Sequence, residues 1–223
     1  MASRAIIFAV NEWYHCFTRS IDRQPVFKDT DDYERFVESL YLCNGSRKLL
    51  RSALHRPSHE HLLTLKRGEP LVAVGAYCLM PNHYHLLLKQ VADNGISTFM
   101  QKLGTSYSMY YNTKYGNIGN VFVKPFRAKH IDKDDYFQHV IQYIHLNPAE
   151  IFEPQWKEGI VRNMDALSAR LGDYRYSSFM DYLGKKRAEN VIIDSTTANL
   201  LASALSVDEV LFEAAEYYKE LNL

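Results

Sequence analysis

The spacing of apolar and polar residues changes along the chain, and these changes mark the expected secondary structure. Residues 12–19 are aromatic and rich in strand-forming side chains, which predicts a strand. Residues 28–43 open with aspartate and threonine acceptors ahead of apolar positions at helical spacing, which predicts a capped amphipathic helix. The polar stretch 44–70 contains glycine and proline and predicts a variable loop region.

The middle of the chain has the pattern of a hairpin, a helix and a further strand. A continuous apolar run at 71–79 predicts a buried strand, and 83–89 predicts a second strand after the break at residues 80–82. Residues 96–114 carry apolar side chains at helical spacing. The segment 120–131, which reads NVFVKPFRAKHI, predicts a strand.

A further helix is predicted at residues 136–147, and it ends where Pro148 follows. The residues after 190 have the pattern of one or two helices with acidic faces. The order strand, helix, strand, strand, helix, strand, helix predicts an α+β fold, in which helices pack on the faces of a mostly antiparallel sheet. We expect one domain at 1–184 and a helical C-terminal extension at 185–223, packed on or near it.

Composition narrows the class of protein. The chain has 223 residues, 47% of them apolar, which is enough for one domain with a buried core and an appendage. It has no long apolar run and no clear signal peptide, so we expect no membrane span and a cytoplasmic location. The three cysteines are far apart in the sequence and form no CxxC pair, so we expect them to be reduced and buried.

The net charge is zero, but the charged residues are unevenly distributed. Residues 1–130 carry 17 Lys and Arg and 10 Asp and Glu, a net charge of +7, and the rest carry 9 and 16, a net charge of −7. The basic part can supply a phosphate-binding face, or the asymmetry can be chance patchiness of a solvated surface. The 16 tyrosines are compatible with base stacking as well as with core packing.

The segment PNHYHLLL contains two histidines, His83 and His85, that a strand would project from the same face. Two neutral imidazoles there can bind one divalent metal ion. An isolated HxH is more often a pair of surface or core histidines. In an apolar strand, however, burying both rings without a partner is costly, which favours a ligand or strong hydrogen bonds.

The segment HVIQYIHLNP places Tyr143 and Asn147 four residues apart, on one face of a helix, with His139 one turn earlier. A tyrosine in this position can lie beside a metal ion that the asparagine helps to hold. Alternatively, Tyr143 is a packing residue and Asn147 ends the helix before Pro148.

Five segments occur together in an order that carries a family resemblance: YHCFTRSIDRQPVF, YCLMPNHYHLLLK, GNVFVKPFRAKHI, DDYFQHVIQYIHLNPAE and DYRYSSFMDYLG. Over roughly residues 12–184, the chain resembles the REP-associated tyrosine transposases, a branch of the IS200/IS605-like transposase family. The segments YCLMPNHYHLLL and YIHLNP are each specific, and their joint order is more so. The resemblance implies the HUH endonuclease fold, a ferredoxin-like or RRM-like sandwich.

The resemblance also implies a metal-dependent enzyme that nicks and rejoins single-stranded DNA. Tyr143 would be the nucleophile and would form a 5′-phosphotyrosine. His83 and His85 would be the metal ligands, with Asn147 as the third ligand where the insertion-sequence branch typically has glutamine. We expect Mg²⁺ or Mn²⁺, although Zn²⁺ also fits these ligands.

The remaining residues of these motifs have less defined roles. Tyr84 would fill the bulky position between the two histidines. We interpret His139 as a residue that supports the metal ligands without binding the metal itself, and His145 as structural or DNA-facing. The expected partner is hairpin-forming single-stranded DNA, such as a repetitive extragenic palindrome, and we expect a monomer.

Basic and aromatic residues just before the catalytic helix are candidates for DNA contacts. Alternation along 120–131 would put Phe122, Lys124 and Phe126 on one face and Arg127 and Lys129 on the other. The alternative is one solvated face and one core face. The full set of DNA-binding candidates is Lys124, Phe126, Arg127, Lys129, Lys89 and Arg19.

Two other functions stay open at this stage. A metal-dependent hydrolase would use His83 and His85 to position a water, and it would form no covalent adduct. A domesticated DNA-binding protein would bind hairpins without cutting them. A regulatory protein unrelated to DNA is disfavoured by the ordered motifs.

Overall fold

In a computed structural model of the chain, four antiparallel strands form a single sheet. The structure describes residues 6–49, 51, 54–55, 57–132, 134–194 and 211. The strands are β1 (Trp13–Arg19), β2 (Val72–Met80), β3 (His83–Gln90) and β4 (Arg127–Ile131), arranged in the order β2-β3-β1-β4. The predicted hairpin is confirmed, since β2 and β3 pair across a turn at Pro81 and Asn82.

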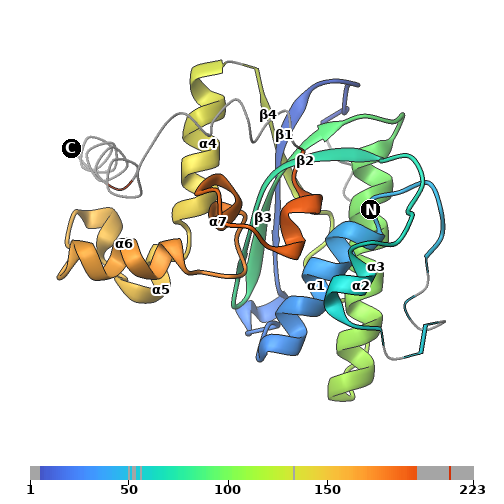
Figure 1. Cartoon of the computed structure of the whole chain (residues 1–223), viewed down its shortest axis with the longest axis horizontal. Coiled ribbons are helices and arrows are strands. Elements are labelled where there is room, and N and C mark those ends of the chain that lie inside the picture. Colours follow the sequence, from blue (N-terminus) through green and yellow to red (C-terminus); the bar gives the residue numbers. More distant parts are fainter. Residues whose placement is uncertain are drawn as a thin grey trace.

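Helices cover both faces of the sheet, as Figure 1 shows, which confirms the predicted α+β fold. On one face lie α1 (Thr30–Leu42) and α3 (Gly95–Tyr115), and on the other lies α4 (Asp134–Leu146). Alternation along β3 divides its side chains between two cores. Tyr84, Leu86 and Leu88 join the larger core beneath α1 and α3, whereas Leu87 packs beneath α4.

The two longest predicted helices form where their sequence signals place them. The carboxylate of Asp29 caps α1 by accepting a hydrogen bond from the backbone N–H of Asp32, so the acceptors ahead of this helix act as expected. Helix α3 ends at Gly116, whose φ of 63° lies in the left-handed region that glycine adopts without strain.

Shorter elements follow α4 and protect one edge of the sheet. They are α5 (Ala149–Phe152), η3 (Trp156–Glu158), α6 (Met164–Gly172), α7 (Phe179–Tyr182) and η4 (Ala188–Ile192). The segment before α7 runs along the edge of β2, where the N–H of Leu79 donates to Tyr176 and the N–H of Ser178 donates to Tyr77. These bonds satisfy backbone groups that an open edge strand would leave exposed.

Three expectations about the elements need correction or lie outside the described residues. The region 44–70 is not all loop, because it contains the short helix α2 (His59–Leu62), capped by Ser58. The strand predicted at 120–131 is wrong in its first half, since β4 begins only at Arg127. Pro125 cannot donate to a strand ladder, and Phe122 keeps only an isolated bridge to Ser20. Most of the tail after 190 lies outside the described residues.

Two expectations from composition can be compared with the structure. Cys16, Cys43 and Cys78 are all buried and none forms a disulfide, which confirms the interpretation of the cysteines. None of the helices in the described part of the chain is long and apolar enough to cross a membrane.

Candidate active site

His83 and His85 project from β3 toward α4, while Tyr84 between them points into the opposite core, which confirms the alternation expected from the sequence. The centroids of the two imidazole rings lie 5.1 Å apart. Nδ1 of His83 is 2.7 Å from Oδ1 of Asn82, the last residue of the hairpin turn. This hydrogen bond leaves Nε2 of His83 available to a ligand.

Helix α4 brings Tyr143 and Asn147 to the same place. Its apolar side chains Val140, Ile141 and Ile144 are buried against the sheet, so the register of the helix on the sheet is fixed by packing. The ring of Tyr143 meets the ring of His85 edge to face, with centroids 5.4 Å apart. Tyr143 keeps 36% of its surface exposed, so its ring is accessible to a substrate.

Asn147 is only 3% exposed, and its amide is hydrogen-bonded to the backbone of its own helix. Nδ2 donates to the backbone oxygen of Tyr143 at 2.7 Å, which turns Oδ1 away from the helix backbone. The amide also lies close enough to the imidazole of His83 to favour its protonated form, which opposes the effect of burial on the pKa of His83. The four residues singled out on two distant segments are therefore neighbours in the fold.

A third histidine, His15 of β1, belongs to this cluster and was missed in the sequence analysis. Its Nε2 lies 2.9 Å from Nδ1 of His85, and its ring centroid lies 5.7 Å from that of Tyr143. The sequence alone hardly reveals this contact. Alternation places His15 on one face of its strand, but only the pairing of β1 with β3 shows that this face carries His85.

Burial keeps the imidazoles of the cluster neutral near neutral pH. Burial lowers the pKa of His15 to about 4, assisted by the positive charge of Lys129. Burial also lowers the pKa of His83, against the opposing effects of Glu150 and Asn147, and it lowers that of His85 well below its usual value. Neutral imidazole is the form that binds metal ions.

The donor atoms of this cluster fit a hard-to-borderline divalent metal ion. Nε2 of His83 and Oδ1 of Asn147 are left available by the hydrogen bonds at their other atoms. Nε2 of His85 is available in the same way when Nδ1 faces His15. In the described part of the chain, no group of three or more His, Cys, Asp or Glu side chains is arranged to hold a metal. A metal bound here would therefore need the asparagine, and oxygen ligands from water or substrate would complete its shell.

The other two histidines of the α4 segment occupy different environments. His139 lies on α4 one turn before Tyr143 with an exposed side chain. His145 is buried on the far side of the helix, where Nε2 lies 2.8 Å from the hydroxyl of Ser178 and the ring stacks on Phe179. Burial lowers its pKa to about 3. Of the two roles considered for His145, the structural one is correct.

Four of the candidate DNA-binding residues share the sheet face of the two histidines. In antiparallel strands, directly paired residues project to the same side. Arg127 pairs with Phe17, Lys129 with His15, Arg19 with His83 and Lys89 with Trp13. Arg19, Arg127 and Lys129 are exposed, whereas the ammonium of Lys89 lies 5.3 Å from the ring of Trp13.

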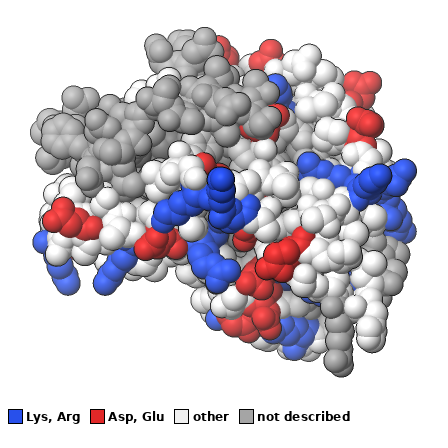
Figure 2. All heavy atoms as spheres, viewed as in Figure 1, with Lys and Arg blue, Asp and Glu red and all other residues white. Residues whose placement is uncertain are grey.

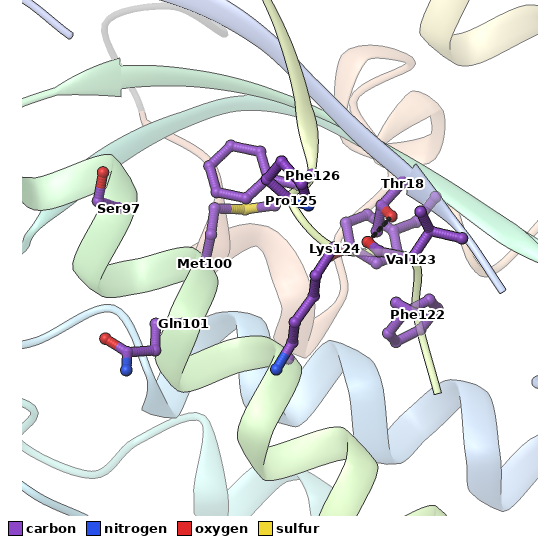
Figure 3. Close-up of a pocket in the computed structure, with 11 residues that line it drawn as sticks. Thr18, Ser97, Met100, Gln101, Phe122, Val123, Lys124, Pro125 and Phe126 are labelled. Atoms are coloured by element: carbon purple, nitrogen blue, oxygen red, sulfur yellow. Dashed lines mark hydrogen bonds between the residues drawn. The ribbon is translucent and has the colours of Figure 1, made fainter. Parts of the chain in front are cut away.

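Lys124 and Phe126 lie with Phe122 on the other side of the sheet from Arg127 and Lys129, as the sequence predicted, although their own segment is not a strand. They line a pocket of about 540 Å³ between α3 and residues 122–126, shown in Figure 3. Thr18 and Tyr84 line the same pocket, which places it on the sheet face opposite the histidine cluster. In Figure 3, Phe126 lies beside Met100 of α3, and the side chain of Lys124 extends toward that helix.

The uneven distribution of charged residues along the sequence does not give every face of the protein a charge of one sign. On the face shown in Figure 2, basic and acidic side chains are interspersed. Strand pairing brings Arg19, Arg127 and Lys129 to the sheet face of the histidine cluster.

Comparisons with known proteins agree with this geometry. The family model described as transposase, IS200-like, matches residues 9–147, which include every residue of the cluster. The solved structure of a REP-associated tyrosine transposase bound to a REP hairpin is similar, with a TM-score of 0.52 and 14% sequence identity. The similarity covers 85% of this chain and 90% of that chain, and it confirms the fold. No curated protein matches the sequence significantly.

Proposed function

Since the chain belongs to the family of IS200-like transposases, we propose that it cuts and rejoins single-stranded DNA with Tyr143 as the nucleophile and a divalent metal held by His83, His85 and Asn147. The observation that carries this proposal is the position of the exposed Tyr143 ring, 5.4 Å from the ring of His85 and one helical turn before Asn147. This proximity supports a site in which a nucleophile and the ligands of a Lewis acid surround the same space.

In the proposed reaction, the phenolic oxygen of Tyr143 attacks a phosphodiester phosphorus and the bond from phosphorus to the 3′ oxygen breaks. The products are a 5′-phosphotyrosine and a 3′-hydroxyl, which takes up a proton. The covalent bond conserves the energy of the phosphodiester, so a 3′-hydroxyl can later reverse the step and join strands. When bound, Mg²⁺ or Mn²⁺ would polarise a phosphate oxygen and stabilise developing charge.

The fixed positions of the protein groups support this mechanism. Packing of α4 on the sheet fixes the Cα position of Tyr143, so little ordering is needed when a substrate binds. The hydrogen bond from Asn147 to the backbone of Tyr143 ties the amide ligand to the nucleophile's own helix turn. His139, one turn earlier on α4, is proposed to support the site without binding the metal itself.

For the partner we propose hairpin-forming single-stranded DNA. The similar solved protein is bound to a REP hairpin, which supports this choice by analogy. Arg19, Arg127 and Lys129 would neutralise phosphates on the histidine face, with Lys89 beside them. Because β4 is an edge strand of the sheet, DNA that wraps this edge would also meet Lys124 and Phe126.

The domain boundary and the oligomeric state are part of the same proposal. We propose a domain at 1–184, an extension at 185–223 that packs on it, and a monomer in solution. Ile192 and Ile193 support the packing of the extension, because both are buried in the core beneath α1. The mass of the full chain in solution, measured by light scattering, tests the monomer.

A denaturing gel tests the proposed reaction. The protein, its Tyr143→Phe variant and a Tyr176→Phe control are incubated with Mn²⁺ and labelled single-stranded hairpin DNA from the region flanking the gene. We expect a slow covalent band with the wild-type protein and the control, but none with Tyr143→Phe or after metal removal. The control removes the same hydroxyl group from a tyrosine at the β2 edge.

The other outcomes point to the two alternative functions. Cleavage that persists in Tyr143→Phe without a covalent band would overturn the tyrosine mechanism in favour of a water nucleophile. Tight hairpin binding without cleavage, for the native flanking hairpins in Mg²⁺ and in Mn²⁺, would identify a domesticated DNA-binding protein.

A further inference from the structure

His15 and His85 are joined by a hydrogen bond between their imidazole rings, which is an unusual contact for two buried side chains. Nε2 of His15 lies 2.9 Å from Nδ1 of His85, and the rings stack with centroids 5.1 Å apart. His15 is 7% exposed and lies on the central strand β1. The two side chains are diagonal neighbours, because His85 pairs directly with Phe17.

This hydrogen bond can form in two ways, and they differ in what the far side of His85 offers. If Nε2 of His15 carries the proton and donates, Nδ1 of His85 accepts and the proton of His85 sits on its own Nε2. If Nδ1 of His85 donates instead, Nε2 of His85 keeps a free lone pair. Only the second arrangement lets Nε2 of His85 bind a metal ion.

We propose that His15 is a positioning residue for the metal site: its Nε2 accepts the Nδ1–H of His85 and thereby holds His85 in the tautomer and ring orientation that binds the metal. This inference rests on the proposed function, since it assumes that His85 is a ligand. His83 has a corresponding arrangement, in which Nδ1 is bonded to Oδ1 of Asn82. Both histidines would then use Nε2 as the ligand atom, each fixed by a partner at Nδ1.

The geometry disfavours His15 as a direct ligand. The ring nitrogen that His15 directs toward the cluster is already within hydrogen-bonding distance of His85. Phe17 also packs against both rings, with its ring centroid 4.9 Å from that of His15 and 5.7 Å from that of His85. His15 therefore acts on the metal through His85.

The test compares one substitution that removes the hydrogen-bond acceptor with one that keeps it. His15→Phe keeps a planar ring and removes the acceptor. His15→Gln keeps an oxygen at the same number of bonds from Cα as Nε2 of histidine. His130→Phe is the matched control, because His130 lies on β4 and pairs with Tyr14 on the opposite face of the sheet.

The readout is Mn²⁺ binding to the full chain without DNA, measured by the electron paramagnetic resonance of free Mn²⁺. We expect His15→Phe to weaken Mn²⁺ binding about 10- to 100-fold, the usual cost of losing a partner that orients a metal ligand. His15→Gln and His130→Phe should bind close to the wild-type level. Metal-free hairpin binding and thermal unfolding report whether each variant is folded.

Two results would overturn the inference while leaving the proposed function intact. One is Mn²⁺ binding in His15→Phe at the wild-type level. The other is equal weakening in His15→Phe and His15→Gln, which would mean that His15 only packs. His83→Ala separates the two proposals: if this variant binds Mn²⁺ as the wild-type protein does, the metal site itself is wrong, and the role of His15 with it.

Discussion

At the scale of single residues, His59 shows how the fold can make stability depend on pH. Its imidazole lies between two carboxylates, with Nε2 3.3 Å from Glu189 and Nδ1 3.5 Å from Glu38. The hydrogen bond to Glu189 and then the contact with Glu38 raise the pKa of His59 from 6.5 to about 9, while burial opposes the shift. These contacts join α2 to α1 and to η4.

Because the pKa of His59 is raised in the folded protein, its contribution to stability is complete below pH 6.5 and is lost as the pH rises through about 9. Between about pH 6 and about pH 10, we expect the free energy of unfolding to fall more in the wild-type protein than in His59→Gln. The expected difference is only about 1 kcal/mol, because solvent screens such ion pairs. Urea unfolding of both proteins at about pH 6 and about pH 10 measures this difference. Parallel losses in the two proteins would show that other groups cause the pH dependence.

The residues of the active site illustrate what sequence patterns can and cannot predict at this scale. His83 and His85 are two apart on one strand, and Tyr143 and Asn147 are four apart on one helix, so local periodicity predicts which of them share a face. His15 enters the cluster through the register of β1 against β3, which depends on contacts between distant segments. No local pattern specifies that register.

At the scale of elements, the packing of α4 on the sheet determines the position of Tyr143, the proposed nucleophile. Ile144, next to Tyr143, is fully buried among Val140, Ile141 and the apolar side chains of the sheet. Removing its side chain beyond Cβ leaves a cavity under the helix, and we expect Ile144→Ala to lower the free energy of unfolding by about 3 kcal/mol. Ile151→Ala, at an exposed position on α5, is the control and should change it by less than about 0.5 kcal/mol.

The same contact should affect catalysis in a milder variant that stays folded. Ile144→Val removes one methyl group, which costs about 1 kcal/mol, so the variant can be assayed at full occupancy of the folded state. We expect slower formation of the covalent adduct with unchanged hairpin binding, because the helix that carries Tyr143 is less firmly held. An unchanged rate in a single-turnover assay would show that α4 tolerates looser packing at this point.

The elements also show where prediction from the sequence fails. The hairpin and the three longest helices follow from apolar periodicity and capping residues, because both signals act over a few neighbouring residues. The segment 120–126 has the composition of a strand, yet Pro125 interrupts its ladder with β1, and Val123 makes the last bond to Arg19. Helix α2 was missed because four residues are too few to show a helical period.

At the scale of the whole molecule, the distribution of charge matters more than its sum. The net charge is zero, yet the sequence up to residue 130 carries +7. Strand pairing brings Arg19, Arg127 and Lys129 to the sheet face that holds His83 and His85. If these side chains neutralise DNA phosphates, binding would release cations condensed on the DNA, even though the protein as a whole is neutral.

This arrangement predicts a specific dependence of hairpin binding on salt. If Arg19 and Arg127 each neutralise one phosphate, replacing either by alanine should weaken binding for all hairpin sequences alike. It should also reduce the slope of log affinity against log salt concentration by about 1. The control is Lys66→Ala, which replaces an exposed lysine between α2 and β2 and should leave the slope unchanged.

Fluorescence anisotropy with a labelled hairpin at several salt concentrations measures the slopes. All variants are made in the Tyr143→Phe background to prevent cleavage. If Arg19→Ala and Arg127→Ala keep the wild-type slope while Lys124→Ala reduces it, the DNA would bind along the pocket on the opposite face.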